Sequence, residues 1–114
     1  MRNTVARLED ILEAIQNVEE YVARGHESFL ADRLVQSWIV QQLQNIGEAA
    51  NYLPTEWLEA HPETDWSDIV GMRHRIVHGY FNIRLDIVWT AATIDLPILK
   101  RAVEALLADH KNDP

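Results

Sequence analysis

One short stretch of the chain holds most of the side chains that could do chemistry. Residues 71–81 read GMRHRIVHGYF and contain two arginines, two histidines and a tyrosine. No Asp or Glu lies between Ile69 and Leu85, whereas the whole chain carries a formal net charge of -8. A local excess of positive charge in an acidic protein points to an anionic ligand. The alternative is a solvated helix that carries these charges by chance.

These residue types suit a reaction at a phosphate ester. A histidine such as His78 has a reference pKa of about 6.5, so it can take or give a proton near neutral pH. Arg73 would offer a permanent charge and a planar fork to the non-bridging phosphate oxygens. RNA brings its own nucleophile, the 2′-hydroxyl, so its cleavage requires neither a protein nucleophile nor a metal. Each chain has one well-placed histidine, and a symmetric dimer would bring two to a shared cleft.

Helical spacing places these groups on two lines. If residues 69–80 are helical, Arg73 and Tyr80 lie nearly in line. His74 and His78, four residues apart, form a second line. Arg73 and His78 then lie about 140° apart and about 7.5 Å apart along the axis. They converge on one phosphate only if the helix frays at its end or the long arginine bends across.

Two other interpretations of this stretch remain open. Histidines one turn apart, such as His74 and His78, can share a metal ion, but no third ligand follows the usual spacing. Arg73 and Arg75 would also repel a cation. A third possibility is that the stretch binds a nucleotide without turning it over.

Length and composition limit the fold and the compartment. The chain of 114 residues is long enough for one domain, residues 1–114, and its four glycines and four prolines leave few turns. Without cysteine it has no disulfide framework or cysteine zinc site, which suits a reducing cytoplasm. No window approaches the ~20 apolar residues of a membrane span. We therefore expect a soluble, cytoplasmic protein with no membrane partner, and one too acidic to bind nucleic acid indiscriminately.

The spacing of apolar residues predicts an all-α fold, an antiparallel bundle of four longer helices and a short one. The first expected helix ends near Arg24-Gly25, the second runs from about Ser28 to Leu53, and a short one covers 54–61. The fourth runs from Thr64 or Asp65 to Gly79. The last helix opens at Asn82 or Asp86 and is kinked near Thr93 by Pro97. His61, which precedes a proline, is expected to be exposed and inert.

The second predicted helix has two features that bear on the site. Within residues 46–50, IGEAA, the small side chains would let a neighbouring helix approach closely. Glu48 in that segment is either a solvated carboxylate or an anchor for the next segment. The helix also carries many uncharged amides, which either bond a partner chain or are solvated: Gln36, Gln41, Gln42, Gln44 and Asn45.

Residues 73–80, RHRIVHGY, resemble the R-x4-H-x-Y signature of HepT-type toxins in the HEPN superfamily. The flanking sequence fits the same family, in order and over nearly the whole chain. The matching segments are DILEAI at 10–15, IGEAA at 46–50, GMR at 71–73, VW at 88–89 and DLP at 95–97. Arg-x4-His occurs by chance in many helices, so the flanks make the resemblance specific.

The resemblance implies a homodimer of all-α, HEPN-like bundles with metal-independent endoribonuclease activity at the dimer cleft and no cofactor. Arg73 and His78 match the family's catalytic positions, and His74 fits as a supporting group. The implied partner is an MntA-like nucleotidyltransferase antitoxin that adenylylates the motif tyrosine, here Tyr80. We therefore expect an RNA-cleaving toxin of a type VII HepT/MntA-like toxin–antitoxin system. The alternative is a non-catalytic nucleotide- or protein-binding partner of that transferase.

Overall fold

The computed structural model describes residues 4–76 and 83–111, and at Arg73, His110 and Lys111 only the backbone. Over these ranges the structure confirms the predicted all-α fold. The elements in chain order are α1 (Thr4–Val22), α2 (His26–Ala31), α3 (Arg33–Asn51), α4 (Thr55–Ala60), α5 (Trp66–Ile76), α6 (Leu85–Thr90), the π-helical turn η1 (Ala91–Asp95) and α7 (Leu96–Lys111). No helix of the described ranges is long and apolar enough to cross a membrane.

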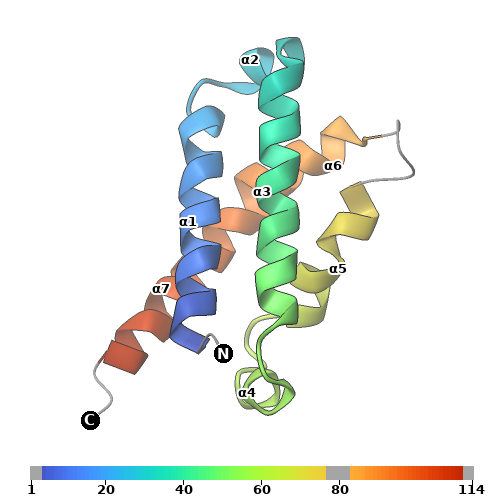
Figure 1. Cartoon of the computed structure of the whole chain (residues 1–114). Helices are drawn as coiled ribbons and strands as arrows, with labels where there is room; N and C mark the ends of the chain where they lie inside the picture. The colour runs from blue at the N-terminus through green and yellow to red at the C-terminus, as the bar shows by residue number, and fades with distance from the viewer. Residues whose placement is uncertain (1–3, 77–82, 112–114) are drawn as a thin grey trace.

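Helix α3 is the central element of the bundle. It runs antiparallel to α1 on one side, and α5 packs against its other side (Figure 1). The last helical run, from α6 to α7, crosses behind them and packs along α1. The arrangement makes α3 the helix that links the N-terminal half of the bundle to the segment with the candidate chemistry.

A single apolar core holds these helices together. The most deeply buried of its side chains, each at most 2% exposed, come from nearly every long helix: Leu8, Ile11, Ile15, Val18, Phe29, Ile39, Leu43, Ile46, Ala50, Met72, Ile76, Val88, Ala91, Leu96, Leu99 and Val103. Burying one Leu or Ile side chain contributes roughly 1.5–3 kcal/mol, so this set dominates the stability of the bundle.

The predicted second helix is wrong in one respect, because it is two helices separated at Asp32. Asp32 has extended backbone angles, and its Oδ1 accepts hydrogen bonds from the N–H groups of Leu34 and Val35 at 2.9 and 3.3 Å. It therefore caps α3. The preceding helix α2 turns inward, where the Phe29 ring lies 5.1 Å from that of Trp89. Capping and this aromatic contact together favour the break over a continuous helix.

The predicted end of the first helix is confirmed. Helix α1 stops at Val22, and a turn leads to Gly25, whose φ of +96° lies in the region that favours glycine. The last helix starts at Leu85, one residue before Asp86, and Asn82 lies outside the described residues. The irregularity predicted near Thr93 is the π-helical turn η1, which ends two residues before Pro97. Such a turn re-pairs backbone groups next to a residue that lacks an N–H.

The connection from α4 to α5 is tied down by aromatic residues. His61 is half-buried: its ring stacks on Trp57 at 4.1 Å between centroids, and its Nδ1 lies 2.8 Å from the Trp57 carbonyl oxygen. The expectation that His61 is exposed is therefore wrong. The indole N–H of Trp66 donates to the His61 carbonyl at 3.2 Å. These contacts fix the point at which α5 begins.

Candidate functional site

The start of α5 is capped by Asp65, one of the two residues that the sequence offered for this role. Asp65 Oδ1 accepts from the Asp68 N–H and from the Ser67 hydroxyl, each at 3.0 Å. The hydrogen bond from the Asp68 backbone N–H, followed by the one from the Ser67 hydroxyl, lowers the pKa of the Asp65 carboxyl from its usual 3.8. The carboxylate also lies favourably at the positive end of the helix dipole.

The core then sets which face of α5 reaches solvent. Ile69, Met72 and Ile76, whose spacing of three and four residues puts them on one face of α5, are buried. This orientation leaves His74 exposed on the outer surface. Arg73 precedes it on the same helix. The first part of the candidate motif therefore lies on α5, a helix that is packed into the core.

Gly47 brings α3 and α5 unusually close together, as the small-residue segment predicted. A Cβ atom at this position would lie 3.3 Å from the Ile69 carbonyl oxygen and 3.4 Å from that of Val70. Both oxygens belong to the backbone of α5, which cannot easily move away. The glycine therefore determines how closely the helix with the candidate motif packs on α3.

Next to this close approach lies a hollow of about 400 Å³ between α3 and α5, here named the α3–α5 groove. It is lined by Gln41, Gln44, Gly47, Glu48, Asn51, Val70 and His74. The α3 residues that face it are mostly uncharged amides spaced three or four apart, and His74 forms part of the opposite wall. The sequence indicated a polar face on α3, but not that His74 would lie across from it.

The positive charge of this region is smaller than the sequence suggested. Arg75 forms an ion pair with Asp68 at 3.0 Å, and Arg84 with Asp86 at 2.9 Å. Asp68 and Asp86 lie just outside the segment without acidic residues, so the fold neutralises charges that the linear sequence left apart. Exposed pairs like these contribute little to stability. Because Arg75 and Arg84 are paired, we expect Arg73 to be the arginine that binds an anion.

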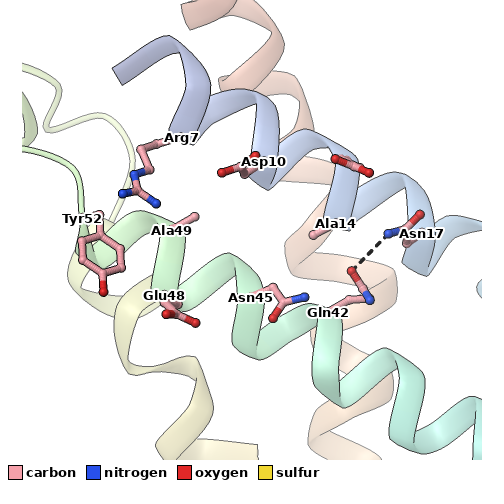
Figure 2. Close-up of a pocket in the computed structure, with 10 residues that line it drawn as sticks. Arg7, Asp10, Ala14, Asn17, Gln42, Asn45, Glu48, Ala49 and Tyr52 are labelled. Carbon is pink, nitrogen blue, oxygen red and sulfur yellow. Dashed lines mark hydrogen bonds between the residues drawn. The ribbon is translucent and has the colours of Figure 1, made fainter. Parts of the chain in front are cut away.

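A second groove of about 400 Å³ lies between α1 and α3 and is here named the α1–α3 groove (Figure 2). Asn17 Nδ2 donates to Gln42 Oε1 at 3.2 Å, and Gln42 is only 4% exposed. The Arg7 guanidinium lies 4.4 Å from the centre of the Tyr52 ring. The side-chain oxygen of Gln42 is thus bonded within the chain, and the residue is largely buried, whereas the sequence suggested a solvated or partner-binding amide.

The predicted site residues are located only in part. His74 is exposed on the wall of the α3–α5 groove, and the backbone of Arg73 belongs to α5. His78 and Tyr80 lie outside the described residues. Their predicted alignment with His74 and Arg73 therefore stays a prediction.

Comparison with known proteins shows the family to which the chain belongs. The family described as Ribonuclease HepT-like matches residues 11–106. That match spans most of the chain, from α1 to α7. The protein therefore belongs to the HepT-like ribonuclease family.

Individual relatives agree with this assignment. The chain is 36% identical over 100 residues to a probable ribonuclease HepT of Thermococcus cleftensis, covering 87% of this chain and 91% of the relative. It is 33% identical over 105 residues to a putative RNase of Caldanaerobacter subterraneus, covering 91% and 94%. A putative RNase of Methanocaldococcus jannaschii is 31% identical over 104 residues, covering 90% and 95%. No solved structure matched the chain.

Proposed function

We propose that the protein is a metal-independent endoribonuclease that uses Arg73 and His78, and that it is the toxin of a HepT/MntA-like type VII toxin–antitoxin pair. The observation that carries the proposal is the match of nearly the whole chain to a ribonuclease family, with the R-x4-H-x-Y motif starting on α5. Relatives over this length are named as ribonucleases or putative RNases, which supports RNA as the substrate.

In the proposed reaction the 2′-hydroxyl of RNA attacks the adjacent phosphorus, and the bond to the 5′-oxygen breaks. His78 serves as a general base or acid for one of these two oxygens. Arg73 binds the non-bridging oxygens, whose charge increases in the transition state. His74, which is exposed on α5, supports the site by binding or orienting the RNA. The expected product ends are a 2′,3′-cyclic phosphate and a 5′-hydroxyl.

The reaction benefits from both an acid and a base, and one motif supplies one histidine at the phosphate. A homodimer with its two motifs facing a common cleft would supply both groups. It would also add a second Arg73 to the cleft of a protein whose net charge is -8. This is the physical reason for proposing that the dimer, rather than the monomer, is the active form.

Tyr80 is the proposed control point for a small MntA-like nucleotidyltransferase. Adenylylation would place an anionic phosphodiester on the tyrosine, two residues after His78 and seven after Arg73 in sequence. That charge would repel the incoming RNA backbone and compete for Arg73. Mass spectrometry after incubation with the transferase and ATP should find AMP on Tyr80 and none on Tyr80→Phe. AMP confined to Tyr21 or Tyr52 would refute this control point.

The activity itself is tested by incubating the purified protein with total RNA in excess chelator. Cleavage that persists and leaves cyclic-phosphate ends is the expected result. Loss of cleavage in chelator with recovery on adding zinc or magnesium would favour a metal site at His74 and His78. RNA binding without cleavage, under all conditions, would instead indicate the non-catalytic binding partner.

A further inference from the structure

We infer that the α3–α5 groove is a subsite for a single RNA base that carries an exocyclic amino group, namely adenine, cytosine or guanine rather than uracil. The inference rests on the proposed function for its ligand class. It concerns residues outside the R-x4-H-x-Y pair that does the chemistry. The described side chains of the groove carry it.

The amides of the groove are available to a ligand. Gln44 is half-buried on the face toward α5, and its amide forms no hydrogen bond with any described residue. The side-chain Nε2 of Gln41 donates a hydrogen bond to Asn45 Oδ1 at 2.9 Å, which leaves the side-chain Oε1 of Gln41 available. Asn51, the last residue of α3 and the last of its residues that line the groove, is exposed. Side-chain amides, which both donate and accept, are among the groups that proteins use to bind base edges.

Glu48 decides which part of RNA the groove can accept. Its carboxylate is exposed, lines the groove and forms no ion pair among the described residues. A phosphate would be repelled there. A base amino group, in contrast, is a good donor to a carboxylate. Uracil has no such group, so the groove should discriminate against it.

The location of the groove relates it to the proposed cleavage site. His74 forms one wall and directly follows Arg73 on α5. A base seated between Gln44 and His74 would place the phosphate of its own nucleotide near residue 73. Gly47 adds no side chain and the half-buried Val70 adds an apolar surface, so the space can hold a flat ring. Base selection and phosphate chemistry would then use neighbouring but separate residues.

The test measures binding without relying on cleavage. Fluorescence anisotropy would compare single-stranded ten-mers of 2′-fluoro A, C and U, in which the attacking hydroxyl is absent. The wild type should bind the A or C ten-mer at least about 5-fold more tightly than U, the low end of discrimination for a good base contact. Gln44→Ala and Glu48→Gln should each bring that ratio toward one. Gln16→Ala, an exposed glutamine on α1, is the matched control and should leave it unchanged.

The outcomes separate this inference from the proposed function. An unchanged ratio in Gln44→Ala and Glu48→Gln, both with wild-type thermal unfolding, would overturn the subsite, as would failure to bind any ten-mer. A ratio sensitive to Gln44 in a protein that cleaves no RNA would support the subsite while rejecting the nuclease. If the wild type cleaves, sequencing of the new ends should show amino-bearing bases beside the cut, and Gln44→Ala should relax that preference.

Discussion

The α1–α3 and α3–α5 grooves are similar in size, about 400 Å³ each, but they use their polar side chains differently. In the α1–α3 groove, Gln42 is buried and bonded to Asn17. In the α3–α5 groove, Gln44 has no hydrogen-bond partner among the described residues, and His74 lies exposed across from it. Both glutamines belong to α3, two residues apart, and therefore point to different sides of it.

The difference teaches how one helix can serve both folding and function. A buried amide that is bonded within the chain is costly to disturb and fixes the packing of α1 on α3. An amide without an internal partner contributes little to folding but keeps its donors and acceptor for a ligand. Glu48 lies at the boundary and lines both grooves. We therefore assign a structural role to the α1–α3 groove and a binding role to the α3–α5 groove.

The largest stability effect expected from this comparison is at Asn17. In Asn17→Ala the buried Gln42 oxygen loses its donor, which should lower the free energy of unfolding by roughly 1–3 kcal/mol. Gln44→Ala removes no internal bond and should stay within about 0.5 kcal/mol of wild type. Urea unfolding followed by circular dichroism measures both. Equal destabilisation by the two substitutions would remove the distinction between the grooves.

A smaller effect is expected from Gly47 of α3 and Gly71 of α5. Gly71→Ala adds a Cβ with nothing within 4 Å and should gain up to ~1 kcal/mol of helix propensity. Gly47→Ala adds a Cβ 3.3 Å from the backbone of α5, so it should lose most or all of that gain. The same unfolding measurement compares them. Equal stabilisation at both positions would mean that α5 can move away from α3.

The smallest effect concerns acid stability at the start of α5. The folded pKa of Asp65 is lowered, mainly by the Asp68 N–H, so the carboxylate stabilises the fold fully above the usual value of 3.8. That contribution is lost as pH falls through the lowered, folded-state pKa. Asp65→Ala lacks it at every pH. The difference in Tm between wild type and variant should therefore be present at neutral pH and shrink well below pH 3.8, and a constant difference would exclude the carboxylate as its source.

The sequence was sufficient to predict features that depend on local spacing. Apolar periodicity identified the core faces of α1 and α5, and the small side chain of Gly47 indicated a close helix contact that the structure confirms. It could not distinguish Gln42 from Gln44. Gln42 is bonded to Asn17, which is 25 residues away in the sequence, whereas the surroundings of Gln44 depend on how α5 packs on α3.

Other features also depended on contacts that spacing does not reveal. Asp32 fits a helix interior as an exposed polar residue, and its role as a cap becomes evident only when Phe29 packs on Trp89 across the fold. The ion pair between Arg75 and Asp68, two helical turns apart, likewise required the helix to be placed before the charge of the motif could be judged. Sequence therefore predicted the position of α5 better than it predicted the charge along this helix.

The most direct test of the account is the rate at which a defined single-stranded RNA is cleaved in excess chelator by wild type, Arg73→Ala, His78→Ala and Arg7→Ala. Arg7 lies in the α1–α3 groove and is the matched arginine control. The account predicts chelator-resistant cleavage by wild type, a loss of at least ~10²-fold for Arg73→Ala and His78→Ala, and about the wild-type rate for Arg7→Ala. It would be contradicted by a wild type that does not cleave, or by equal losses at Arg7 and Arg73 in folded proteins.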